Sequence, residues 1–252
     1  MSKDAHPSKQ KFNWQPNGKL ILLVLCLFPL LMFLGFWQLE RAVEKQGIVD
    51  EFTVNRQAAP AGIEALAGDD NLQYRTALLV GVLDADRRVI LDNRVKLGRP
   101  GYEILEVLSI EGFEPKILVN RGWVPAALDR DVLPDVPSVL GQVELRGAMY
   151  RTLGGYRLDD GIGVITKWPA RVGWISSDRA AVLFAEEFYP YQLRLDAASP
   201  GALTTGWVTV AVQPAKHTGY AVQWFAMAAV LLLMTVIANS NLTDWLKSKR
   251  EN

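Results

Sequence analysis

The chain has 252 residues, a formal net charge of zero, and hydrophobic side chains at 50% of its positions. The balanced charge gives no indication of a nucleic-acid-binding surface, and the single cysteine excludes a disulfide within the chain. The length is ample for one domain held together by core packing. The first structural information therefore comes from where the apolar residues lie along the chain.

The first long apolar run covers residues 20–39, after a polar tail of residues 1–19. It contains no charged residue and has about the 20 residues that a helix needs to cross the hydrocarbon layer of a bilayer. The run is longer than the apolar core of a signal peptide and lacks a small-residue cleavage site, so we expect a permanent anchor. Good helix formers at residues 38–45 predict that the helix continues past the membrane and ends before Pro60.

Residues 40–216 are polar enough to fold in water, and from residue 73 onward they contain short apolar stretches bounded by turn residues. This pattern favours an antiparallel barrel or sandwich over alternating strands and helices. The expected fold class is therefore α+β, with two transmembrane helices bracketing one mainly antiparallel β domain that has short helices. The expected strands cover residues 73–82, 89–91, 102–110, 116–120, 143–149, 164–166, 191–195 and 207–210.

The connections of this domain are predicted from their polar and turn-forming residues. Residues 84–88 indicate the turn of a hairpin, and residues 99–101 (Arg-Pro-Gly) indicate a second turn. Residues 178–187 predict a helix, for which Ser177 or Asp178 would be the N-cap.

The second long apolar run covers residues 217–238 and is followed by a polar tail of residues 239–252. Basic residues flank the outer end of each run, and the positive-inside rule then places both termini in the cytoplasm. The domain of residues 40–216 is accordingly expected in the periplasm, and the protein is expected to be a multi-pass component of the inner (cell) membrane. The flanking basic residues are Lys3, Lys9, Lys11, Lys19, Lys247, Lys249 and Arg250.

His217 opens the second apolar run and is one of two histidines in the chain, the other being His6 in the N-terminal tail. In a helix, Tyr220, Ala221 and Trp224 would share the face of His217, because they follow it by three, four and seven residues. A neutral imidazole beside aromatic rings and a small residue suits a flat iron porphyrin, with the imidazole nitrogen as a ligand of the metal. The alternative is an aromatic belt at the membrane interface, in which His217 has no special role.

The outer end of the first run carries a second stripe, in which Trp37, Arg41 and Lys45 recur every four residues. Both stripes lie on the same side of the membrane at a similar depth, so they could meet. Arg41 and Lys45 could pair with anionic groups such as porphyrin propionates. The alternative, favoured for Lys45, is contact with phospholipid headgroups. Small residues on the two runs would allow close approach of the helices, namely Gly35, Ala221 and Ala228.

A third constellation, residues 119–125, places Arg121 beside Trp123 where a strand is expected to end and turn at Gly122. The structural interpretation is a strand-end corner with Trp123 in the core. The functional interpretation is contact of Arg121 with a propionate or with a partner protein. Both interpretations are compatible with the residues.

Sequence patterns of common enzymes are missing from this chain. It has no Gly-x-Ser-x-Gly, no Cys-x-x-Cys, no His-Glu-x-x-His and no phosphate-binding glycine loop. No histidine lies within residues 40–216, so this domain lacks the commonest general base. We therefore expect that the protein is not an enzyme.

Three segments together resemble the signatures of the Surfeit locus protein 1 family of cytochrome c oxidase assembly factors. They are residues 35–41 (Gly-Phe-Trp-Gln-Leu-Glu-Arg), residues 119–125 (Val-Asn-Arg-Gly-Trp-Val-Pro) and residues 217–225 (His-Thr-Gly-Tyr-Ala-Val-Gln-Trp-Phe). The resemblance covers nearly the whole chain in order. The chain departs from the family pattern at residues 106–108, where Glu-Val-Leu replaces a Thr-Pro-Leu, and at residues 154–163.

The resemblance implies a non-enzymatic role in the maturation of a haem–copper oxidase. Bacterial members of the family are similar to haem a-binding proteins that help insert haem into the catalytic subunit, with the second-span histidine as the iron ligand. The implied partners are the catalytic subunit of cytochrome c oxidase, the membrane and the haem a synthesis machinery. The alternative is a cofactor-free chaperone of the same subunit, and a membrane-anchored periplasmic enzyme is a remote third reading. The expected haem-binding residues are His217 as the metal ligand, with Tyr220, Trp224, Trp37, Arg41 and Arg121.

Overall fold

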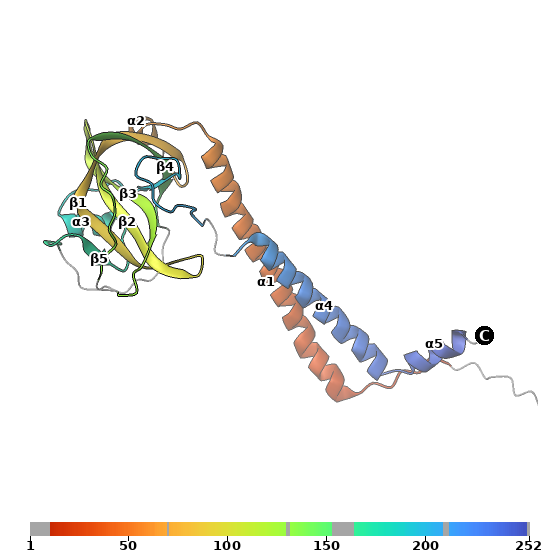
Figure 1. Cartoon of the computed structure of the whole chain (residues 1–252). Coiled ribbons are helices and arrows are strands. Elements are labelled where there is room, and N and C mark those ends of the chain that lie inside the picture. Colours follow the sequence, from red (N-terminus) through yellow and green to blue (C-terminus); the bar gives the residue numbers. More distant parts are fainter. Residues whose placement is uncertain (1–10, 70, 130–131, 153–163, 209–211, 251–252) are drawn as a thin grey trace, which may run out of the picture. The chain divides into compact units, whose positions relative to one another are not determined.

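The computed structural model describes residues 11–69, 71–129, 132–152, 164–208 and 212–250, which belong to two compact units (Figure 1). One unit contains both ends of the chain, up to Val49 and from Val210 onward. The other unit comprises Asp50–Thr209. Two candidate membrane helices and a mostly antiparallel β domain are therefore present, and the predicted α+β class is confirmed.

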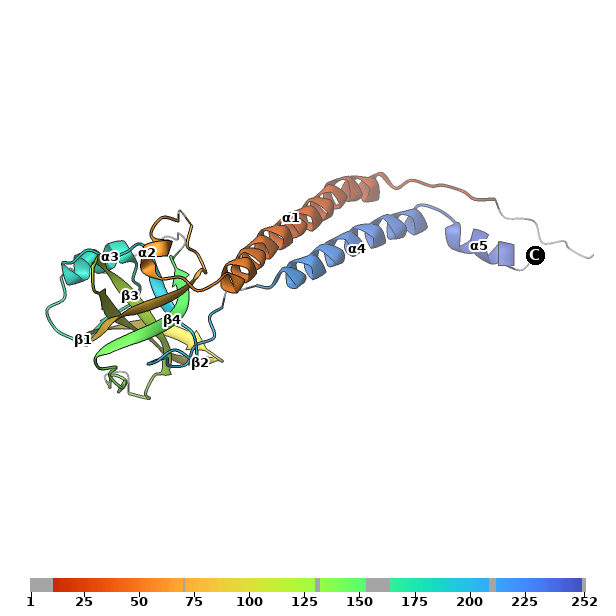
Figure 2. The ribbon, with the colours of Figure 1, turned by 90° about the horizontal axis from the view of Figure 1, so that it is seen from above.

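The first unit is built from α1 (Gly18–Gln57, whose last turns belong to the second unit), α4 (Pro214–Ala238) and α5 (Leu242–Arg250). Both α1 and α4 are long and apolar enough to cross a membrane. They lie side by side in both ribbon views (Figure 2). The predicted extension of the first helix beyond residue 39 is present, since α1 is 40 residues long and ends before Pro60.

The polar segments at the ends of these two helices are hydrogen-bonded to each other. The backbone amide of Gln15, before α1, donates to the carbonyl oxygen of Asn239, after α4, at 2.6 Å. The amide of Asn17 donates to the side-chain oxygen of Asn239 at 2.5 Å. The two helices are thus antiparallel, with the start of α1 beside the end of α4.

The second unit is a closed five-stranded barrel. Its strands pair in the order β2-β3-β6-β4-β1, and a further pairing of β1 with β2 closes the ring. The pairs are antiparallel except β3–β6 within the ring, and β5 adds to β1 from outside in parallel. The sequence pattern was compatible with a barrel or a sandwich, and the closed ring of strands shows that the domain is a barrel. The strands are β1 (Thr76–Lys96), β2 (Arg99–Ile110), β3 (Phe113–Pro125), β4 (Gln142–Tyr150), β5 (Ala170–Val172) and β6 (Gln192–Leu195).

The predicted hairpin turn at residues 84–88 is wrong, because these residues lie within β1, a single strand of 21 residues. The chain bends there at a bulge between Asp84 and Val89. The Asp84 carboxylate accepts the backbone amides of Asp86 and Arg87, each at 3.1 Å, which satisfies the donors that leave the ladder. The bulge lets one strand pair with β4 at its beginning and with β2 over the rest, which is how the barrel closes.

Three other predicted elements are also displaced. The turn expected at residues 99–101 is wrong, since the chain reverses at Leu97 and Gly98, which both have positive φ, and β2 has already begun at Arg99. No strand forms at residues 164–166, and β5 lies at Ala170–Val172 instead. Residues 207–208 are also not in a strand, and residues 209–210 lie outside the described residues.

Two short helices cover the barrel, namely α2 (Ile63–Leu66) and α3 (Ser177–Phe184). The N-cap of α3 is Ser176, whose hydroxyl accepts the amide of Arg179 at 3.2 Å, so the predicted caps are one and two residues late. The buried face of α3 joins a cluster of strand residues outside the barrel interior. The main core is formed by fully buried side chains from five strands, among them Leu79, Leu108, Val119, Leu145 and Leu193.

Candidate functional site

Small residues set the contact between α1 and α4. Gly35 on α1 and Ala221 and Ala228 on α4 are buried, whereas most of their neighbours are exposed. A Cβ atom at Gly35 would overlap the ring of Phe225, so only glycine leaves room for that ring. The ring of Phe225 also packs edge-on against Phe36, with centroids 5.3 Å apart. The predicted close approach at these small residues is confirmed.

His217 lies in the first turn of α4 and is half-buried against α1. Its Nδ1 atom is 2.8 Å from the side-chain oxygen of Gln38. Because that oxygen can only accept a hydrogen bond, Nδ1 is the donor, and in the neutral imidazole Nε2 then keeps its lone pair. The hydrogen bond therefore fixes the imidazole in the tautomer whose free nitrogen can bind a metal.

The predicted aromatic residues lie next to this histidine. Tyr220 and Trp224 occupy the following two turns of α4, with Tyr220 50% exposed and Trp224 half-buried. On α1, Trp37 directly precedes Gln38 and is 40% exposed. These side chains keep solvent-accessible surface that a flat apolar ligand could cover.

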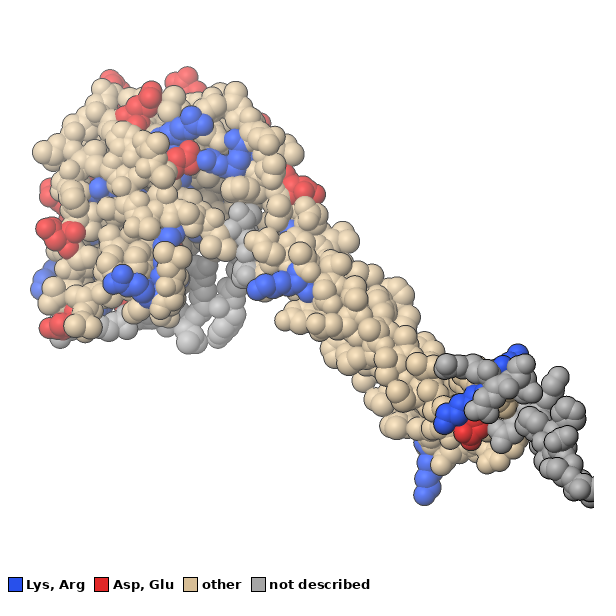
Figure 3. All heavy atoms as spheres, turned by 45° about the vertical axis from the view of Figure 1, so that its right-hand side comes forward, with Lys and Arg blue, Asp and Glu red and all other residues tan. Residues whose placement is uncertain are grey.

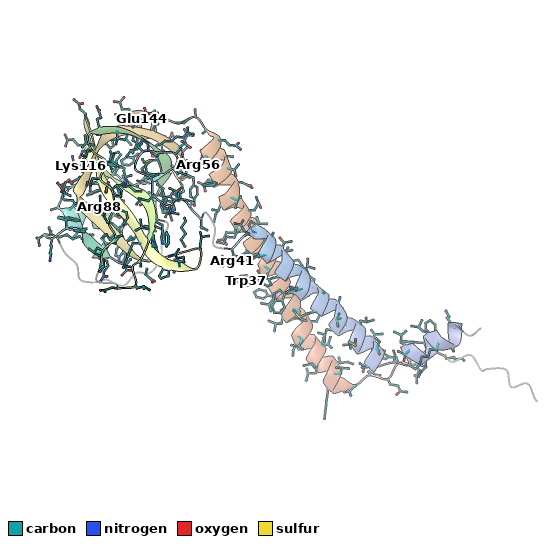
Figure 4. All side chains as sticks on the ribbon, viewed as in Figure 1. Trp37, Arg41, Arg56, Arg88, Lys116 and Glu144 are labelled. Atoms are coloured by element: carbon teal, nitrogen blue, oxygen red, sulfur yellow. The ribbon has the colours of Figure 1, made fainter. Side chains whose placement is uncertain are left out.

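Arg41 stands one turn after Trp37 on α1, as Figure 4 shows. Its guanidinium carbon is 5.8 Å from the centre of the Trp37 ring. Glu44, which the sequence pattern does not single out, pairs with both cations of this stripe, with Arg41 at 2.5 Å and with Lys45 at 2.9 Å. All these groups have solvent-accessible surface, so the pairs are weak and an incoming anion can compete for Arg41.

Arg121 has a different environment from the other five predicted residues. It lies within β3, and its side chain is 1% exposed. Each nitrogen is already used, since Nε donates to the carbonyl oxygen of Gly201, Nη1 to Glu106 and Nη2 to the carbonyl oxygen of Pro137, at 2.8, 2.6 and 2.8 Å. The role of Arg121 as a propionate ligand stays a prediction, and it is the least supported of the six, because this guanidinium is buried and each of its nitrogens already has a partner.

The corner predicted at Gly122 is also different in the structure. Strand β3 runs on to Pro125, and Gly122 has a φ of 123° at a bulge opposite Ile104 and Leu105. Trp123 is half-buried rather than in the core, and its indole nitrogen donates to the carbonyl oxygen of Arg94 at 2.8 Å. This segment is thus a structural element of the barrel wall.

Two residues of the site escaped the sequence analysis, namely Gln38 and Phe225. Gln38 is the one polar side chain in residues 20–39 with an amide, and an amide in an apolar helix usually has an interhelical partner. The sequence alone could therefore have indicated Gln38 as a contact residue. The fit of Phe225 over Gly35 requires the register of two helices and cannot be read from either one alone.

Charged side chains are unevenly distributed along α1 and α4. In Figure 3 the visible face of α1 and α4 is free of charged groups along its middle, and basic groups gather at the far end near α5. Lys11, Lys19, Lys247 and Lys249 belong to that end. Fold and site together define a pair of antiparallel helices, both able to cross a membrane, with a β-barrel domain between them in the sequence.

The profile of the SURF1 family matches residues 25–229, which include most of both apolar helices and the whole barrel. The chain therefore belongs to the SURF1 family, which is known generally for oxidase assembly factors.

Individual relatives agree with this assignment. A SURF1-like protein of Rickettsia felis is 32% identical over 108 residues, and one of Rickettsia bellii is 34% identical over 108 residues. The aligned stretch is 42% of this chain in both cases, and it spans only 46% and 43% of those relatives. A SURF1-like protein of Monosiga brevicollis is 22% identical over 238 residues, which are 87% of this chain and 88% of the relative.

Proposed function

We propose that this protein is a membrane-anchored assembly factor for a haem–copper cytochrome c oxidase that binds haem a and aids its insertion into the catalytic subunit. The observation that carries the proposal is the hydrogen bond between His217 and Gln38, because it leaves Nε2 of the imidazole free to bind iron. Family membership supports the assembly role, and it supports the view that the role is not catalytic.

The residues around His217 suit the chemistry of a haem group. Tyr220, Trp224 and Trp37 offer apolar ring surface for the macrocycle, and Arg41 offers a cation for a propionate. Bound haem would supply the iron to which the imidazole nitrogen coordinates. The protein residues would hold the group, keep it out of water and release it to the catalytic subunit, with the haem a synthesis machinery as the source.

The topology that we propose has both termini in the cytoplasm and the barrel in the periplasm. The antiparallel arrangement of α1 and α4 supports placement of both termini on one side, and the basic residues at that end favour the cytoplasm. A reporter fused after Asn252 should be cytoplasmic, and one inserted at the exposed Leu97 should be exported. An exported reporter at Asn252 would contradict this topology.

The decisive experiment is a haem spectrum of the full chain purified from cells that produce haem a. The wild type should show a Soret band, and His217→Ala should lose it while the protein still inserts into the membrane. Added imidazole should restore the band in His217→Ala, because a free imidazole can occupy the position of the missing side chain. The wild-type spectrum should not change with imidazole.

The control for this experiment is His6→Ala. His6 lies outside the described residues and, in the proposed topology, on the opposite side of the membrane from His217, so this variant should keep the wild-type spectrum. A normal spectrum in His217→Ala would refute the ligand assignment. A wild-type protein without haem that still co-purifies with the catalytic subunit would favour the alternative, a cofactor-free chaperone.

A further inference from the structure

The barrel unit contains a cavity of about 170 Å³ whose lining is mostly apolar. Four aromatic residues line it, namely Phe52, Tyr74, Tyr150 and Trp207, and Arg194 lies among them. A cavity of about 150 Å³ lined by apolar side chains is large enough to hold a benzene molecule. This cavity is therefore large enough for a single aromatic ring, and too small for a porphyrin.

Arg194 is the unusual member of this lining. Its guanidinium carbon lies 3.3 Å from the centre of the Tyr150 ring and 4.9 Å from the centre of the Trp207 ring. Its Nε atom is buried and has no hydrogen-bond partner. Among the described residues, no carboxylate oxygen lies within 4.0 Å of its nitrogens. Arg194 is therefore held by aromatic rings and by a hydrogen bond with Tyr150, and its buried Nε donor remains available to an anion.

The acidic groups near Arg194 are occupied elsewhere. Asp196, on the rim of the same cavity, is paired with Arg56 at 2.6 Å, and Arg56 is labelled in Figure 4. The Glu103 carboxylate accepts the side-chain amide of Asn120 at 2.7 Å. Burial lowers the pKa of the Arg194 guanidinium, and the nearby Tyr150 and Glu103 oppose this effect only in part. Among the described residues, neither Asp196 nor Glu103 therefore forms an ion pair with Arg194.

Arg194 also connects this cavity to its surroundings. Two further hollows, of about 330 and 210 Å³, include Arg194 in their lining, together with Arg94 and Glu103. The first of these also contains Lys96 and Trp207. A ligand can therefore approach the guanidinium from the surface, past two further basic side chains.

We propose that this cavity binds a small molecule that combines one aromatic ring with one carboxylate. The ring would pack among Phe52, Tyr74 and Trp207, and the carboxylate would accept hydrogen bonds from Arg194. An anion at this position would satisfy Nε, which is otherwise a buried donor without a partner. This site is independent of the haem site, so either proposal can fail without the other.

The test uses the full chain in lipid nanodiscs, labelled with 5-fluorotryptophan. The ¹⁹F resonance of Trp207 is assigned by its loss in Trp207→Phe, and it reports on the ring that lines the cavity. The probe is 3-phenylpropionate, and the matched neutral probe is 3-phenylpropanamide. We expect a saturable shift of the Trp207 resonance with the carboxylate and at least about tenfold weaker binding of the amide, because only the carboxylate forms a charged hydrogen bond.

Substitutions then locate the anion. Arg194→Met should lower the affinity for 3-phenylpropionate by about tenfold or more. Arg194→Lys should lower this affinity less, because lysine keeps the charge. The matched control is Arg146→Met, since Arg146 is 56% exposed, pairs with Asp196 at 3.4 Å and does not line the cavity. This control should bind both probes as the wild type does.

Three outcomes would overturn the proposal, namely no saturable shift of Trp207, equal affinity for both probes, or unchanged binding in Arg194→Met. Should Arg194→Met fail to fold, the comparison of the two probes on the wild-type protein decides alone. Asp159 and Asp160 lie outside the described residues, so the double variant Asp159→Asn/Asp160→Asn is included. Binding that occurs only in this variant would mean that the chain supplies its own carboxylate, and would also overturn the proposal.

Discussion

Gln38 on α1 and His217 on α4 form a hydrogen bond of 2.8 Å that joins the two apolar helices. A hydrogen bond to the second nitrogen of a metal-binding imidazole orients the ring, and its loss commonly costs about 10- to 100-fold in metal affinity. The contact between these two helices and the state of the proposed iron ligand are therefore set by one side-chain pair.

The first prediction concerns Gln38→Leu. Haem should bind about tenfold more weakly than in the wild type, because the imidazole loses its orienting partner but remains present. A titration of the Soret band with added haem measures this effect. The control is Gln223→Leu, because Gln223 is an exposed amide on α4 and should leave the affinity unchanged.

The second prediction concerns the buried ion pair of Arg121 with Glu106. Both side chains are almost fully buried, at 1% and 0% exposure, so Arg121→Met should destabilise the barrel by about 1–3 kcal/mol, because the buried Glu106 then keeps only Arg88 as a cationic partner. The double variant Arg121→Met/Glu106→Leu should lose less free energy of unfolding than the two single variants lose when added together.

Urea unfolding of the full chain, followed by near-ultraviolet circular dichroism, measures both quantities. The haem spectrum of folded Arg121→Met should equal that of the wild type, because Arg121 is buried and each of its nitrogens already has a partner. A folded variant that had lost its haem would support Arg121 as a propionate ligand.

The third prediction concerns the contact of Gly35 with Phe225. Gly35→Val should destabilise the helix pair by about 1–3 kcal/mol, because a side chain overlaps the aromatic ring. The double variant Gly35→Val/Phe225→Ala should recover part of the thermal midpoint and of the haem spectrum. Gly47→Val is the control, since no neighbouring atom lies within 4 Å of a Cβ at Gly47. If Gly47→Val and Gly35→Val behave alike, the effect arises from helix propensity and the contact is unimportant.

The fourth prediction concerns the pH dependence of the bulge in β1. Although burial raises the pKa of the Asp84 carboxyl, the hydrogen bonds from Arg87 outweigh it and hold the pKa below its usual value. The resulting stability is present above the unfolded-state pKa of about 3.9 and is lost as the pH falls through the lower folded-state value.

Asp84→Asn should therefore unfold about 0.5–1 kcal/mol more easily than the wild type at pH 7. The difference should shrink steadily below about pH 4, where the wild-type carboxyl also becomes neutral. Urea midpoints across this range measure the change. Glu114→Gln is the control because Glu114 is exposed, and a difference that stayed constant with pH would exclude the proposed cause.

The sequence was sufficient for features that depend on neighbouring residues. The two apolar runs, the extension of α1 and the small residues Gly35, Ala221 and Ala228 follow from length and helical spacing, and the structure contains all of them. The spacing of Tyr220 and Trp224 behind His217 likewise follows from the helix alone.

Features that depend on distant residues were not predictable in this way. Residues 84–88 have the composition of a turn, but pairing with β2 both before and after them keeps the chain running in one direction through the bulge. A glutamate in a strand, such as Glu106, is expected to be exposed. In the structure it is buried, because Arg88 and Arg121 from other strands pair with it. For the same reason the burial of Arg121, and its hydrogen bonds to Glu106 and to two backbone carbonyl groups, could not be read from the sequence.

Phe52 and Arg56, near the beginning of the barrel unit, line the same cavity as Trp207 and Val208, near its end. The two ends of this unit therefore adjoin, as they do in domains that tolerate insertion into a host chain and circular permutation. A short linker could close the barrel on itself, with new termini opened at Leu97, which is 92% exposed at the tip of a hairpin. The barrel thus has the end-to-end geometry of a domain that can be inserted into a host chain or excised from it without separating its own strands.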